Sequence, residues 1–145
     1  SAHGELLRTR LHLYSKILAN RLLAASLRPA VTYIDAQRER MRVIDDLQAA
    51  LQEVDVIVTP STPILPYKIE EQQFGVEWKG ASLSRFTSPF NLSGLPAISL
   101  PCGFTDSGLP VGLQIAGPAF GEALVLRVAQ AYETSTNWHN RLPDI

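Results

Sequence analysis

Residues that could act as nucleophiles, bases or metal ligands are few and widely separated in this sequence. The three histidines, His3, His12 and His139, do not stand at the spacing of metal ligands on one helix or strand, and the single cysteine adds no partner. No Gly-x-Ser-x-Gly motif is present, and no lysine completes a Ser-x-x-Lys motif. We therefore predict no metal, no cofactor and no catalytic residue in this chain.

Two polar side chains stand out by their surroundings. Asn91 lies in an otherwise apolar segment, and a buried amide must bond either to the backbone or to a ligand. The backbone role is the more frequent one, and both stay open for Asn91. Arg40 follows Glu39 on a predicted helix, where a cation on the solvated face is the commoner interpretation.

Composition restricts the class of protein. The formal net charge of −1 gives no electrostatic reason to expect direct binding of nucleic acid. No apolar run reaches the length of a membrane span. The N-terminus lacks the pattern of a secretion signal, and a single cysteine fits a reducing compartment. We expect a cytoplasmic protein that does not contact the membrane.

The periodicity of apolar residues and the turn signals predict one unit over residues 1–145. Its expected elements are helices at about 5–27 and 30–53, a strand at 55–59, a long loop at 60–83, a short helix within 84–92, a hairpin at 97–117 and a helix at about 121–136.

The predicted strands are apolar on both faces, which is typical of central strands that helices cover on both sides. Three short strands and three helices cannot cover one another in that way. The chain is therefore predicted to be part of a larger α/β sheet. The alternative is that a second copy supplies the cover, as a homodimer.

Several motifs in order resemble one protein family. Residues 85–104 read RFTSPFNLSGLPAISLPCGF, residues 108–120 read GLPVGLQIAGPAF, and Ala36-x-x-x-Arg40 precedes DVIVTPSTP at 55–63. Together they strongly resemble the C-terminal part of the amidase signature family, over about residues 30–143. The resemblance implies an α/β fold, in which this chain is a C-terminal fragment that contributes part of a mixed β-sheet with flanking helices.

The resemblance also implies a chemistry. Members of the family are amide hydrolases or amidotransferases that use a Ser nucleophile, a second Ser in a cis peptide and a neutral Lys. The chain would match the last third of such an enzyme, with the catalytic residues N-terminal to Ser1. We expect it to be inactive alone, to associate with that N-terminal part, and to act there on a small-molecule amide.

Substrate-binding positions are carried over from the family. Arg40 matches a position that helps to hold the substrate carboxylate in the A subunits of aminoacyl-tRNA amidotransferases. Ser84 stands where those subunits have an Asp, and this departure favours a general amidase over use of glutamine. The segment around Thr87, Phe90 and Asn91 would form a wall on the acyl side of the pocket. The alternatives are the A subunit of an amidotransferase and a non-catalytic, self-associating module.

Overall fold

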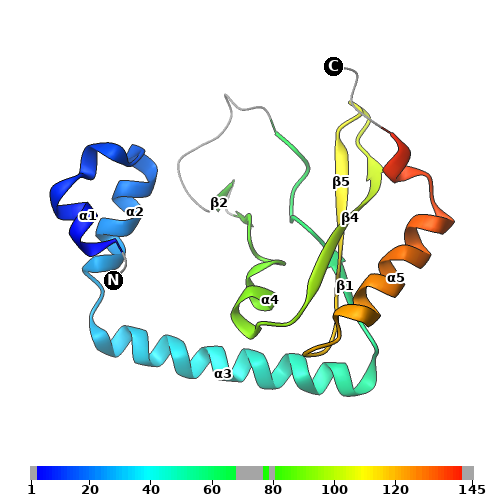
Figure 1. The fold of residues 1–145 in the computed structure, drawn as a ribbon, viewed down its shortest axis with the longest axis horizontal. Coiled ribbons are helices and arrows are strands. Elements are labelled where there is room, and N and C mark those ends of the chain that lie inside the picture. Colours follow the sequence, from blue (N-terminus) through cyan, green and yellow to red (C-terminus); the bar gives the residue numbers. More distant parts are fainter. Residues whose placement is uncertain (1–2, 68–76, 79–80, 142–145) are drawn as a thin grey trace. The chain divides into compact units, whose positions relative to one another are not determined.

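The computed structural model of the chain describes residues 3–67, 77–78 and 81–141 (Figure 1). It divides into two compact units, Ser1–Glu39 and Arg40–Ile145. Each unit is described by itself.

The first unit contains short helices in place of the single helix predicted over 5–27. Helix α1 covers Gly4–Thr9, a 3-10 turn η1 covers Leu11–Leu13, and helix α2 covers Lys16–Ser26. The apolar stripe runs through the break, but Ser15 starts a new helix because its hydroxyl accepts a hydrogen bond from the backbone N–H of Leu18 at 3.4 Å. This capping bond starts a second helix within residues 5–27, where the helical spacing of apolar residues predicts one continuous helix.

Helix α3 covers Ala30–Glu53, which is the range predicted for the second helix, and it begins directly after Pro29. Proline is well tolerated at a helix start because its missing N–H would have no partner there. An ion pair of Asp35 and Arg38 forms on its surface, with Arg38 Nη1 3.1 Å from Asp35 Oδ1. Both side chains are exposed, so this pair adds little to stability.

The second unit is built on a three-stranded antiparallel sheet in the order β1-β5-β4. Strand β1 covers Ile57–Pro60, β4 covers Ala97–Phe104 and β5 covers Pro110–Ala116. In the hairpin between β4 and β5, the backbone N–H of Leu109 donates to Thr105 Oγ1 at 3.0 Å. Two-residue strands β2 (Glu77–Trp78) and β3 (Ala81–Ser82) pair within the predicted loop, whose residues 68–76 and 79–80 lie outside the described residues.

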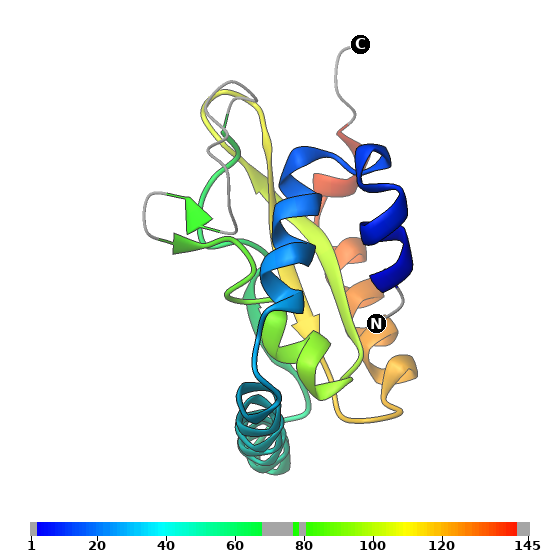
Figure 2. The same cartoon turned by 90° about the vertical axis from the view of Figure 1, so that its left-hand side faces the viewer.

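Helices of the chain itself cover both faces of the sheet along β5, the central strand, so the expectation that its own helices could not supply this cover was wrong at β5. Helix α5 (Glu122–Ser135) packs Ala129 against Leu100 and Ile115 on one face. On the other face, Phe90 of helix α4 (Ser88–Ser93) packs with Ala116 of β5. Figure 1 shows α4 and α5 on opposite sides of the sheet, and Figure 2 shows the same elements from a second side. This arrangement confirms the predicted α/β class.

Candidate substrate-binding face

Most of the predicted site residues lie on one short segment, which consists of a turn and helix α4. The backbone oxygen of Ser84 accepts hydrogen bonds from the N–H groups of Thr87 at 3.1 Å and Ser88 at 2.8 Å, and this turn leads into α4. The helix ends at Gly94, which has a φ of 74° and donates its N–H to the oxygen of Phe90 at 2.9 Å. The sequence folds this segment into a tight turn and helix, so Ser84, Thr87 and Phe90 are close together.

The environments of these residues differ from one another. Phe90 is buried in the core below α4, whereas Ser84 and Thr87 are half-buried. Asn91 is exposed, so the expectation of a buried amide at this position was wrong. The reason is geometric, since successive side chains on a helix point about 100° apart and Phe90 occupies the face that packs on the sheet.

Arg40 on α3 contacts the C-terminal end of α4. Its Nε donates to the backbone oxygen of Leu92 at 2.6 Å, across 52 residues of sequence. The last carbonyls of a helix have no partner within the helix, and a cation is favourable there. Arg40 is exposed, as its spacing on the helix predicts, but it also joins α3 to the segment that carries the other predicted site residues.

One polar residue that the sequence did not single out is central to this face. Gln114 is 5% exposed, and no other polar side chain in the described part of the chain is buried to this degree. Its Nε2 donates to Thr59 Oγ1 at 2.9 Å and to the backbone oxygen of Phe86 at 2.8 Å. The signal in the sequence was a lone amide between Leu113 and Ile115, in an otherwise apolar strand.

Gln114 belongs to a polar row that crosses the sheet. Thr59 of β1 and Ser99 of β4 both stand in register with it. Directly cross-strand neighbours point to the same face, so all three side chains lie on the face that carries α4. Next to this row, the hydroxyl oxygens of Ser61 and Ser99 are 2.5 Å apart, and the backbone N–H of Ser61 donates to the oxygen of Gly112 at 2.8 Å.

A pocket of about 350 Å³ opens beside Gly112 and Ser61. Its other lining residues are Thr62, Ile64, Leu65, Pro66, Tyr67, Leu83 and Pro110. The walls are mainly apolar, with hydroxyl groups as the polar side-chain atoms. Such a surface suits an uncharged organic group better than an ion.

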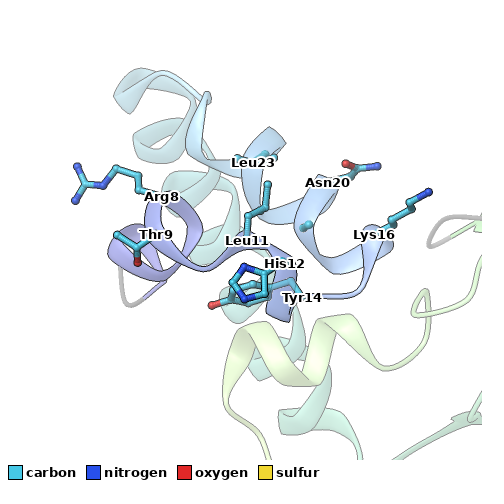
Figure 3. Close-up of a pocket in the computed structure, with 9 residues that line it drawn as sticks. Arg8, Thr9, Leu11, His12, Tyr14, Lys16, Asn20 and Leu23 are labelled. Atoms are coloured by element: carbon cyan, nitrogen blue, oxygen red, sulfur yellow. The ribbon is translucent and has the colours of Figure 1, made fainter.

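A second pocket lies within the first unit, between the turn after α1 and helix α2 (Figure 3). Arg8 and Lys16 contribute to its rim, but Figure 3 shows these two side chains pointing away from each other on opposite sides. His12 and Tyr14 lie between them. Since the two cations do not converge, the pocket does not form a site for an anion.

The described residues offer hydrogen-bond groups and apolar walls. Within them, no three His, Cys, Asp or Glu side chains gather where they could hold a metal ion. No helix in the same part of the chain has the length and apolar character needed to cross a membrane.

The sequence matches the family described as Amidase over residues 5–126, and the chain therefore belongs to this family. One relative is the A subunit of the glutamyl-tRNA(Gln) amidotransferase of Synechococcus sp. (strain JA-2-3B'a(2-13)). The two are 48% identical over 113 residues, which are 78% of this chain and 22% of that protein. The chain thus spans about a fifth of the length of the curated relatives it matches.

Solved structures agree with this assignment. A crystal structure of an amidase superposes with a TM-score of 0.79 at 30% identity, over 92% of this chain and 31% of the other. The A subunit of the glutamyl-tRNA(Gln) amidotransferase of Thermotoga maritima superposes with a TM-score of 0.64 at 34% identity, over 86% of this chain and 25% of the other. The resemblance to the amidase signature family is confirmed, and so is the fold that it implied.

Proposed function

We propose that this chain is the C-terminal portion of an enzyme that hydrolyses the C–N bond of small carboxamides, and that it forms one wall of the acyl pocket. The observation that carries the proposal is the family match, which includes both Arg40 and the segment 84–91. The hydrogen bond from Arg40 to Leu92 supports a common site, because it holds these separate parts of the sequence together.

The reaction would use a Ser nucleophile, a Ser in a cis peptide and a neutral Lys, all outside this chain. The Lys accepts the proton of the nucleophile through the second Ser, and the nucleophile attacks the amide carbon. The amine then leaves with a proton, and water releases the acid from the acyl-enzyme. Ser84, Thr87, Phe90 and Asn91 would line the acyl side, and Arg40 would hold a carboxylate on substrates that carry one.

The test compares the 145-residue chain with a longer protein that also contains the Ser–Ser–Lys region. Ammonia release from a series of aliphatic and aromatic carboxamides is measured for both. We expect release from the longer protein and none from the chain alone. Reproducible hydrolysis by the purified 145-residue chain, free of host enzymes, would contradict the proposal.

A second candidate is the A subunit of an aminoacyl-tRNA amidotransferase that takes its amide nitrogen from glutamine. The 48% identity to a protein of this kind favours it. Ser84 opposes it, because those subunits are expected to carry an acidic residue there for the amino group of glutamine. Glutaminase activity of the longer protein that rises with partner subunits and charged tRNA would establish this candidate over the first.

A third candidate is a non-catalytic module that assembles through its apolar sheet, and the open edges of β1 and β4 in the described sheet are compatible with it. A specific dimer of the chain that buries these edges would favour this candidate. For each of the three we propose a cytoplasmic protein that does not bind nucleic acid directly.

A further inference from the structure

We propose that Gln114 is a positioning residue that sets the place of the segment Ser84–Asn91, and through it the shape of the acyl wall. The inference deepens the proposed function and rests on it for the role of that wall. Gln114 itself does not need to touch the substrate.

The first support is the burial of the amide. A buried polar side chain costs free energy unless its hydrogen bonds are satisfied. Gln114 is 5% exposed, and its Nε2 makes two bonds of 2.9 and 2.8 Å. Ala116, two residues further along β5 and on the same face, is apolar and fully buried, so apolar residues fit this face of the strand. The amide is therefore best explained by the groups that it bonds.

The second support is the position of those groups. One acceptor, Thr59 Oγ1, lies on the neighbouring strand, which the backbone ladder of β1 and β5 already holds. The other acceptor, the oxygen of Phe86, lies in the irregular turn before α4, 28 residues away in sequence. Since a carbonyl oxygen only accepts, the amide group must present Nε2 to it. The bond to Phe86 thus ties a turn to the rigid centre of the sheet.

The third support is that α4 is short and is held near both ends. Gln114 bonds Phe86 ahead of the helix, and Arg40 bonds Leu92 in its last turn. A helix of this length is marginal in water without tertiary contacts. Phe90 anchors its buried face, whereas the two bonds hold the backbone just ahead of the helix and in its last turn. Loss of the bond to Phe86 should let the turn that carries Ser84 and Thr87 move.

The experiment uses the longer protein that contains the Ser–Ser–Lys region. Gln114→Met keeps the size of the side chain and removes both bonds, and Thr59→Val removes only the bond within the sheet. Hydrogen exchange is followed for peptides that cover residues 84–94 and, as an internal reference, 122–135. For Gln114→Met we expect exchange over 84–94 to rise about three- to tenfold, the range set by one net hydrogen bond, with 122–135 unchanged.

In the same variants, kcat and KM are measured for the best carboxamide. Gln114→Met should raise KM by a similar factor, about three- to tenfold, with kcat changed less than about twofold. Thr59→Val should leave both constants and the exchange of 84–94 near the wild-type values.

The outcomes separate the two proposals. The positioning role is overturned if exchange over 84–94 is unchanged in Gln114→Met, or if Thr59→Val has an equal effect. It is also overturned if exchange rises equally over 84–94 and 122–135, because Gln114→Met then only lowers the overall stability. A selective rise over 84–94 in a protein whose wild type hydrolyses no carboxamide supports the positioning role and overturns the proposed function.

Discussion

Gly112 lies beside the hydroxyl groups of Ser61 and Ser99, on the face of the sheet that carries α4. A methyl group at this position would be 2.7 Å from Ser61 Oγ and 2.9 Å from Ser61 Cβ. Contacts this short force the segment after β1 to shift. The glycine is therefore required by packing, and its neighbours form part of the wall of the adjacent pocket.

We predict that Gly112→Ala lowers the free energy of unfolding by about 1–3 kcal/mol, the usual cost of overpacking. Urea unfolding of the purified protein measures the change. Adding Ser61→Gly removes the atoms that clash and should restore part of the loss. A double variant no more stable than Gly112→Ala would contradict this account of the contact.

Gln114 and Asn91 show that a polar residue among apolar neighbours in the sequence can be either buried or exposed in the structure. Both are amides among apolar residues, and only Asn91 was predicted as a candidate. In the structure Gln114 is buried and bonded, whereas Asn91 is exposed. The role of Asn91 in binding an amide stays a prediction.

Helix α4 depends on a residue with left-handed backbone at its end. Gly94 has a φ of 74°, and an added methyl group would meet nothing within 4 Å. The preference for glycine there is a property of the backbone alone. It ends the helix so that the chain can enter β4.

We predict that Gly94→Ala costs about 1–2 kcal/mol of unfolding free energy, because alanine is disfavoured in the left-handed region. Gly94→Asn should cost less, since asparagine tolerates this conformation better. Thermal or urea unfolding of the two variants gives the comparison. Equal losses would show that the backbone angle is not the cause.

Helix α5 offers a test of which face is buried. Val125 is 3% exposed and its neighbour Leu126 is 58% exposed. Val125→Ala should cost about 2 kcal/mol, from lost burial and the cavity that remains. Leu126→Ala should change the free energy of unfolding by less than about 0.5 kcal/mol when the chain is measured at a concentration too low for self-association. A cost for Leu126→Ala as large as that for Val125→Ala would mean that this exposed face is covered in solution.

The chain as a whole leaves considerable apolar surface exposed on its second unit. Val58 on β1 is 52% exposed, and Leu126 and Phe120 are more exposed still. Exposed apolar surface next to open strand edges favours association. This surface is compatible with packing against the longer part of an amidase, which is the arrangement proposed above.

We predict that the isolated 145-residue chain self-associates, so that light scattering gives a mass above the 15.9 kDa of one copy. Under the proposed function, adding a separately produced N-terminal part that contains the Ser–Ser–Lys region should replace this self-association with a defined complex. A stable species of 15.9 kDa at micromolar concentration would contradict the prediction.

The sequence by itself determined the family, the α/β class and helix α3. These follow from local signals, namely an apolar period over 30–53, turn chemistry between β4 and β5, and motifs of fixed order. Only the tertiary structure decided the burial of Gln114, the exposure of Asn91 and the bond from Arg40 to Leu92. The physical reason is distance along the chain, because bonds across 28 and 52 residues depend on how helices pack on the sheet, which no local period encodes.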